Sequence, residues 1–119
     1  MPETPLHYQT IMEVASKIQS RELSPVELTR TILDRIQALD SQLLSYATVM
    51  ADQALDAAQK AEAEIAAGRY LGQLHGVPIA VKDLCFTKGV STMGGSQVLR
   101  DLVPEFDGTV VQNLNAAGA

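Results

Sequence analysis

The chain has 119 residues, of which 46% are hydrophobic and 19% are charged. This composition is typical of a packed globular protein and differs from the polar, highly charged composition of disordered chains. The length is below the roughly 150 residues that serve as a prior for one domain. We therefore expect one domain or part of one.

Charge and metal-binding residue types exclude several classes of function. Nine Lys and Arg against fourteen Asp and Glu give a net charge of −5, without a basic stripe, so direct binding of nucleic acid is not expected. Cys85 is the single cysteine, and only His7 and His75 offer imidazole groups. No disulfide, metal site or cofactor is therefore expected.

The ends and apolar runs of the sequence favour a soluble protein of the reducing cytoplasm. The first ten residues carry an acidic residue and no apolar run behind it, unlike a secretory signal. No run approaches the roughly 18 apolar residues of a membrane helix. We expect no contact with a membrane.

Two helices are predicted in the first forty residues. Thr10 and Glu13 have the spacing of a capping box, and an apolar stripe of Val14, Ala15 and Ile18 predicts a helix over 10–19. Ser24 then provides a hydroxyl cap before Pro25 at the first helical position, with a carboxylate on Glu27. Apolar residues at helical spacing extend this second helix over 24–39.

Further elements are predicted along the middle and end of the chain. Residues 43–49 are β-branched and aromatic near their end and predict a short strand. The alanine-rich stretch 52–67, ending before Gly68, predicts a helix. Residues 108–117 predict a last helix, with Asp107 as its cap.

Residues 77–81, Val-Pro-Ile-Ala-Val, are apolar on both faces, which is typical of a strand buried in a sheet covered on two sides. Together with the helices, this strand predicts an α/β fold in which helices pack on a mixed central sheet. The last helix is not followed by a strand that returns to the sheet, as an α/β pattern normally requires. We therefore expect residues 1–119 to be an incomplete part of a single domain.

Lys82 and Asp83 follow this strand directly and are the sharpest chemical feature of the sequence. Active sites of open α/β sheets gather at the carboxyl ends of strands. From spacing alone, a solvated lysine that limits aggregation is the more common explanation. Asp83 lies on the opposite face from Lys82, and we expect it to order the following loop through backbone hydrogen bonds.

The stretch 74–84 (LHGVPIAVKDL), followed by 87–92 (TKGVST) and Gly94-Gly95-Ser96, resembles the N-terminal part of the amidase signature family. Residues 20–28 and 107–119 fall in the same order and spacing. The resemblance implies cleavage of carboxamide C–N bonds by a Ser, cis-Ser, Lys triad, in which the lysine matches Lys82. Both serines and the oxyanion donors would lie beyond the residues present, so the resemblance also implies that this chain alone is inactive.

The resemblance leaves three functions open. The first is an amidase that acts on a small carboxamide. The second is the amidase-type (A) component of glutamyl-tRNA amidotransferase, and the third is a non-catalytic helical interaction module. Cys85 is expected to be a buried small residue, because no histidine neighbours it in the sequence, and His75 to be structural or solvated, because no second histidine or carboxylate lies at ligand spacing. Ser96 matches a loop residue of the family in this resemblance, which implies a packing role.

Overall fold

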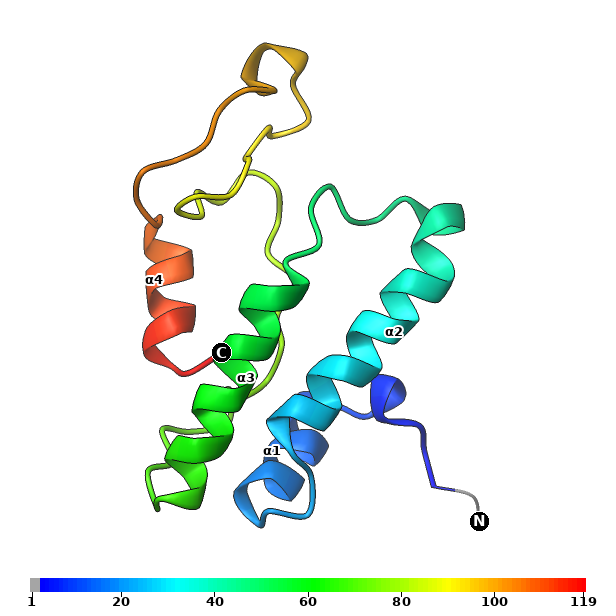
Figure 1. Ribbon diagram of the computed structural model, residues 1–119, viewed down its shortest axis with the longest axis vertical. Coiled ribbons are helices and arrows are strands. Elements are labelled where there is room, and N and C mark those ends of the chain that lie inside the picture. The colour runs from blue at the N-terminus through cyan, green and yellow to red at the C-terminus, as the bar shows by residue number, and fades with distance from the viewer. Residues whose placement is uncertain (1–2) are drawn as a thin grey trace.

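The computed structural model describes residues 3–119 and consists of helices joined by turns and one long loop (Figure 1). No strand occurs within this described range, so the predicted α/β fold with a mixed central sheet is wrong for this chain. The elements are the 3-10 helices η1 (Leu6–Tyr8) and η2 (Gln97–Leu99) and the α-helices α1 (Ile11–Gln19), α2 (Pro25–Leu43), α3 (Ala51–Ala66) and α4 (Thr109–Ala116).

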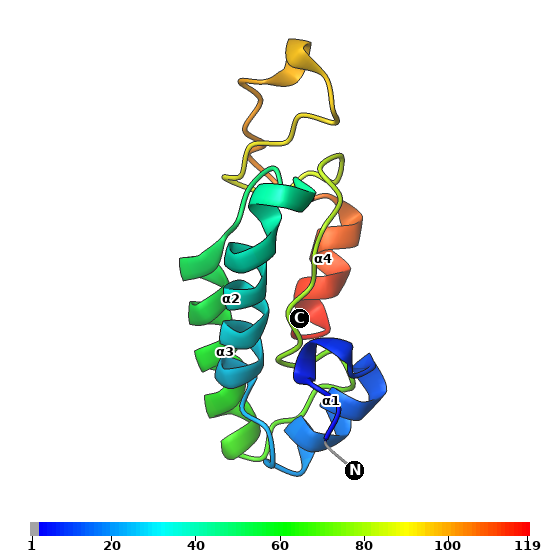
Figure 2. The same ribbon diagram turned by 90° about the vertical axis from the view of Figure 1, so that its right-hand side faces the viewer.

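The helices form two layers. Helices α2 and α3 lie side by side and antiparallel (Figure 1), and in the side view they form one layer, with α1 and α4 in the other (Figure 2). Residues 77–82 run along the long axis of the molecule and behind α3 in Figure 1. The loop after them projects beyond the helices at one end.

Side-chain caps fix the starts of α1 and α2, as predicted. The Thr10 hydroxyl accepts a hydrogen bond from the backbone N–H of Glu13, whose carboxylate accepts one from the Thr10 N–H at 2.6 Å. The hydrogen bonds that the Thr10 N–H and the Thr10 hydroxyl donate to this carboxylate favour its ionised form and lower the pKa of Glu13. The Ser24 hydroxyl accepts from the N–H groups of Val26 and Glu27, at 3.0 and 3.3 Å.

The turn between α1 and α2 also caps α3. Arg21 has a left-handed backbone, with φ of 64°, and so ends the first helix without a glycine. Its guanidinium donates hydrogen bonds to the carbonyl groups of Ile65 and Ala66, at 3.3 and 3.2 Å. Because these carbonyls lie in the last turn of α3, Arg21 joins the two layers through a charge-assisted cap.

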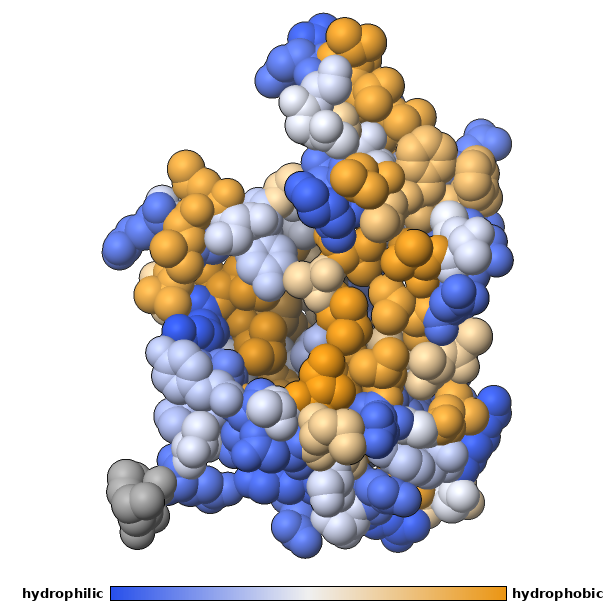
Figure 3. Space-filling view, turned by 180° about the vertical axis from the view of Figure 1, so that it is seen from behind, coloured by the Kyte–Doolittle hydropathy of each residue, from blue (hydrophilic) through white to orange (hydrophobic). Residues whose placement is uncertain are grey.

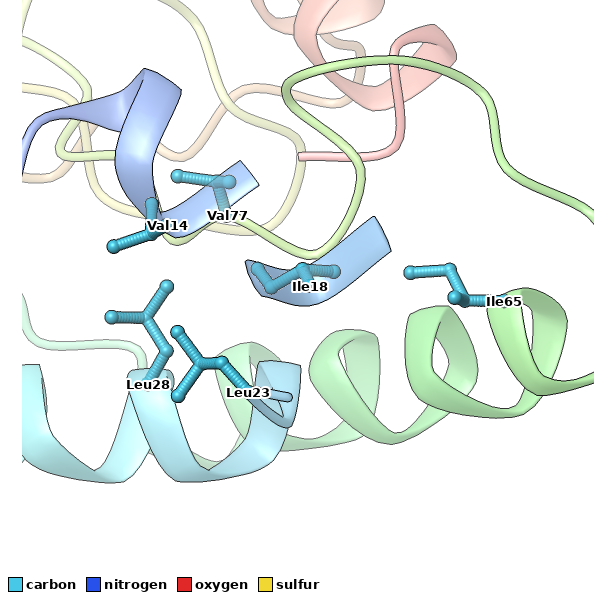
Figure 4. Close-up of a cluster of buried hydrophobic side chains, with 6 residues drawn as sticks. All are labelled: Val14, Ile18, Leu23, Leu28, Ile65 and Val77. Atoms are coloured by element: carbon cyan, nitrogen blue, oxygen red, sulfur yellow. The ribbon is translucent and has the colours of Figure 1, made fainter. Parts of the chain in front are cut away.

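The main hydrophobic core lies between the two layers near one end of the molecule (Figure 4). Ile18 is the most deeply buried member, with 1% of its surface exposed. Helix α1, the start of α2 and the end of α3 all contribute to this core, as does the residue that begins the 77–82 segment. Its members are Val14, Ile18, Leu23, Leu28, Ile65 and Val77.

The predicted strand over 43–49 is also wrong, because α2 continues to Leu43. Leu44 then takes a left-handed conformation, and the Asp40 carboxylate accepts hydrogen bonds from the N–H groups of Ser45 and Tyr46. These bonds turn the chain toward α3 and leave residues 43–49 exposed. No glycine or proline marks the end of α2 in the sequence. This explains why the sequence pattern predicts that the helix ends at residue 39, before its actual end at Leu43.

The predicted buried strand over 77–81 is overturned as well. Val77 is buried in the core, but Ile79 and Val81 are 37% and 39% exposed, and Ala80 is exposed. A strand exists only when a neighbouring strand accepts its backbone hydrogen bonds, and no such neighbour lies among residues 3–119. The apolar sequence therefore produces an unpaired segment.

None of the helices in the described part of the chain combines the length and hydropathy required to cross a membrane. The predicted cytoplasmic location stays a prediction.

We predict that Ser24→Ala lowers the free energy of unfolding by about 1 kcal/mol, because two N–H groups of the first turn of α2 lose their acceptor. Ser41→Ala is the matched control, since Ser41 lies exposed in the same helix and its hydroxyl makes no hydrogen bond within residues 3–119. Urea unfolding measures both. Equal midpoints for Ser24→Ala and the unmodified chain, at an equal slope, would contradict the capping role.

Candidate active site

Lys82 is held at the end of the unpaired segment 77–82 by anchors on both sides. At the start, Gly76 has φ of 80° and donates a hydrogen bond to the Gly118 carbonyl at 2.8 Å. A Cβ at Gly76 would lie 2.7 Å from the Pro25 side chain, so only glycine fits between the segment and α2. At the end, the Lys82 carbonyl accepts a hydrogen bond from the N–H of Cys85, which closes a tight turn.

The Lys82 side chain is exposed, and within residues 3–119 its amine forms no ion pair or hydrogen bond. The sequence predicts that this side chain faces a cavity or the space left by the missing part of the domain, where it is open to water. A hollow of about 130 Å³ does adjoin the segment, but at its opposite end, beside Val77 and Pro78. Lys82 is not among the residues that line it.

Asp83 fastens the glycine-rich turn to the end of this segment. Its carboxylate accepts a hydrogen bond from the N–H of Met93 at 3.1 Å, and its carbonyl accepts one from Gly94 at 2.6 Å. The prediction that Asp83 orders the loop is therefore confirmed. The two bonds fix the turn at 93–95 beside the backbone that carries Lys82.

The loop beyond this turn doubles back on itself toward α4. Backbone hydrogen bonds join Thr92 to Leu102, Gly89 to Pro104 and Gly108 to Phe86. The rings of Phe86 and Phe106 pack against each other, with their centroids 5.5 Å apart. The projecting loop is therefore closed by hydrogen bonds across its base.

The predicted cap of α4 by Asp107 is wrong. The cap residue is Gly108, which has no side chain to accept a hydrogen bond. The Asp107 carboxylate instead accepts from the N–H of Lys88 at 2.7 Å and from the Asn115 amide at 3.4 Å. Because Lys88 precedes Asp107 by 19 residues, the sequence pattern gives no signal for this contact.

Ser96 and Cys85 lie in the loop that follows Lys82, and their assignment as residues without a catalytic role stays a prediction. The Ser96 hydroxyl accepts a hydrogen bond from the N–H of Val98 and so caps η2. Cys85 is a half-buried free thiol. Within residues 3–119, neither side chain shares a hydrogen bond with a histidine or with Lys82.

His75 is a buried structural residue with 1% of its surface exposed. Its Nδ1 accepts a hydrogen bond from the Leu71 N–H at 3.1 Å, so the proton is assigned to Nε2, which donates to the Glu64 carboxylate at 3.0 Å. Tyr70 stacks on the ring. Both ring nitrogens therefore take part in hydrogen bonds that join residues 64–75, which is a structural role for His75.

Glu64, the partner of His75, is a residue that the sequence patterns do not single out. It lies 11 residues earlier on α3, and its second carboxylate oxygen is 3.7 Å from the Arg69 guanidinium. No local motif marks this spacing. Among the described residues, no group of three histidine, cysteine or carboxylate side chains could hold a metal ion.

The site thus consists of an exposed lysine amine beside a glycine-rich turn held by hydrogen bonds. Within residues 3–119, no nucleophilic side chain forms a hydrogen bond with that amine. Such a lysine can act as a base only when its amine is neutral, which burial in a water-poor site favours.

Comparison with known proteins identifies the family of the chain. The model of the amidase family matches residues 27–119. "Putative amidase AmiD" of Mycobacterium tuberculosis is 52% identical over 109 residues, which cover 92% of this chain and 23% of that protein. The amidase-type (A) component of the glutamyl-tRNA(Gln) amidotransferase of a Geobacter species (strain M21) is 48% identical over 110 residues, covering 92% of this chain and 22% of that protein.

A solved structure from work on a vestigial protein complex and the evolutionary origins of an s-triazine catabolic enzyme superposes with a TM-score of 0.88 and 31% identity. The match covers 93% of this chain and 24% of that chain. The protein therefore belongs to the amidase signature family. It spans slightly less than a quarter of the length of these relatives.

We predict that Asp83→Ala accelerates amide hydrogen exchange at Met93 by about tenfold or more, because a hydrogen bond to a charged acceptor is lost. The matched control is Asp101→Ala, since the Asp101 carboxylate is 93% exposed and lies at the far end of the same loop. An unchanged exchange rate at Met93 would show that the carboxylate does not hold the turn.

Proposed function

We propose that this chain supplies the catalytic lysine of an amidase that hydrolyses small carboxamides and releases ammonia or an amine. The lysine is Lys82, which matches the lysine of the Ser, cis-Ser, Lys triad in the family resemblance. It would accept the proton of the serine hydroxyl as that oxygen attacks the amide carbon. No cofactor, metal ion or nucleic acid takes part in this proposal.

The position of Lys82 carries the proposal. This residue lies inside the region that matches the amidase family and ends an apolar segment whose two ends are fixed. Ile79 and Val81 stay half-exposed in this chain. If protein covered them, they would form a dry wall before the amine, and such a wall favours a neutral lysine.

The mechanism also needs groups that residues 3–119 do not bring to Lys82. A nucleophile forms the acyl intermediate, and preorganised N–H donors stabilise the oxyanion. The family resemblance implies that the nucleophile and the oxyanion donors come from a Gly-Ser-rich segment outside these residues. We therefore expect the isolated chain to be inactive, although it carries the base.

A second candidate is the amidase-type component of glutamyl-tRNA amidotransferase. It is favoured by the 48% identity to that component from Geobacter, close to the 52% to the amidase relative. Leu84, Cys85 and Phe86 follow the Lys-Asp pair here, where the amidotransferase component commonly has Asn directly after the pair, and we therefore prefer the general amidase. A helical module without catalysis is the third candidate, and a measurement of amide hydrolysis separates it from the other two.

The test is a chimera in which this chain replaces the matching 109-residue segment of the M. tuberculosis relative. We predict that Lys82→Ala lowers kcat for simple aliphatic and aromatic amides by about 10²- to 10⁴-fold, the usual contribution of a general base. Lys88→Ala is the matched control, because Lys88 is an exposed lysine six positions further along. Its kcat should stay within about twofold of the unmodified chimera.

The isolated 119-residue chain provides the other arm of the test. It should hydrolyse no amide faster than its Lys82→Ala variant does. Hydrolysis by the isolated chain would reveal a nucleophile within it, and Ser96 and Cys85 would then be substituted. An active chimera that Lys82→Ala leaves unchanged would contradict the role of Lys82.

A further inference from the structure

His75 is a buried titratable side chain that takes no part in the proposed catalysis. Its ring is 1% exposed and contacts three separate parts of the chain. Nε2 lies 3.0 Å from the Glu64 carboxylate on α3, and Nδ1 lies 3.1 Å from the backbone nitrogen of Leu71. A Cβ at Gly118, after α4, would lie 2.6 Å from the ring. The ring is therefore held on several sides.

The bond from Leu71 requires the neutral ring. A backbone N–H can only donate, so Nδ1 must offer it a lone pair, and the ring proton is assigned to Nε2. A second ring proton would place an N–H group at Nδ1, opposite the N–H of Leu71. Two donors cannot share a hydrogen bond. The charged ring and the Leu71 bond therefore exclude each other.

The bond to Glu64, in contrast, is compatible with both charge states of the ring. Nε2 carries a proton in the neutral tautomer and in the imidazolium, and the carboxylate accepts from either. Charging the ring turns this contact into an ion pair, which is stronger than a hydrogen bond from a neutral donor. A proton thus strengthens one contact of the ring and removes the other.

Glu64 supplies the charge that compensates an imidazolium. It is the one charged side chain that bonds to the ring within residues 3–119. Arg69 lies 3.7 Å from the second oxygen of this carboxylate, but its side chain is 67% exposed, so water and salt screen its charge. Tyr70, the other titratable residue in contact, stacks on the ring with centroids 6.1 Å apart, and Gly118 has no side chain.

The turn that contains Leu71 is open to water. Figure 3 shows mostly hydrophilic residues at the lower end of the molecule, which is the end where α3 terminates in Figure 1. Leu71 is 44% exposed, and a Cβ at the neighbouring Gly72 would meet no atom within 4 Å. Leu71 therefore has room to move into solvent, where water accepts its N–H.

We propose that the His75 ring, the Glu64 carboxylate and the Leu71 amide form a pH-sensitive clasp. At neutral pH the ring holds both α3 and the turn at 70–72. In acid the ring takes up a proton, keeps Glu64 and releases Leu71, so that the turn opens. Histidine is the side chain whose charge ordinarily changes between about pH 5 and 8. The clasp does not involve Lys82 and is independent of the proposed function.

Nuclear magnetic resonance of the 119-residue chain at about pH 8 and about pH 5 tests the clasp. The nitrogen signals of the His75 ring should report a proton on Nε2 alone at the higher pH and on both nitrogens at the lower. Protection of the Leu71 amide against hydrogen exchange, corrected for the intrinsic effect of pH, should fall by about tenfold or more in acid. The Val77 amide is the internal control, because it bonds to the Leu74 carbonyl.

Glu64→Gln tests whether the carboxylate enables the switch. The glutamine oxygen still accepts from Nε2, but it carries no charge to compensate an imidazolium. We expect this ring to stay neutral at about pH 5 and Leu71 to keep its protection. Glu62→Gln is the matched control and should behave as the unmodified chain, since Glu62 is exposed on the same helix and forms no ion pair within residues 3–119.

A His75 ring that stays neutral at about pH 5 in the unmodified chain would overturn the proposal. A charged ring with unchanged protection of Leu71 would do the same, as would an equal loss of protection at Val77, which would mean that acid unfolds the whole chain. Equal behaviour of Glu64→Gln and Glu62→Gln would contradict the role of the carboxylate. Circular dichroism checks that both variants keep their helices, and the unmodified chain decides the matter if Glu64→Gln does not fold.

Discussion

The unpaired segment 77–82 is the constraint on which the rest of the structure depends. Val77 is buried in the core, Gly76 fits against Pro25, and Asp83 ties the following turn to the segment. Between these anchors the backbone has no hydrogen-bond partner within residues 3–119. The position of Lys82 is therefore fixed by contacts at both ends of the segment, although nothing packs over the segment itself.

The same anchors connect the segment to the C-terminal helix. A Cβ at Gly118 would lie 2.6 Å from the His75 ring, and the Gly118 carbonyl accepts the hydrogen bond of Gly76. His75 is held in turn by Glu64 on α3. The buried His75 thus lies in contact with both the residues that follow α4 and the start of the apolar segment.

Local rules were sufficient to predict the starts of α1 and α2 and failed for the strands, the end of α2 and the cap of α4. The caps at Thr10 and Ser24 depend on residues within one turn, so their sequence patterns carry the information. A strand depends on a neighbour that is distant in sequence, and the apolar pattern of 77–81 specifies only the burial that such a neighbour would provide. The contacts between Glu64 and His75 and between Asp107 and Lys88 join distant positions in the same way.

The candidate site was predictable to a similar extent. The residue type and motif around Lys82 single it out, and the ordering role of Asp83 follows from its place after the segment. The exposure of Lys82 agrees with the expectation that the chain is an incomplete part of a domain, in which this side chain is more exposed to water than in the whole. The matched region is slightly less than a quarter of the length of the similar chains.

Nuclear Overhauser contacts in the free 119-residue chain would show whether the segment before Lys82 has a strand partner. We expect residues 78–82 of the monomer to show no cross-strand contacts between Hα atoms, while α1, α2 and α3 show the sequential amide contacts of helices. Cross-strand contacts at Ile79 or Val81 in the monomer would mean that a second strand exists within this chain, and would contradict the unpaired segment.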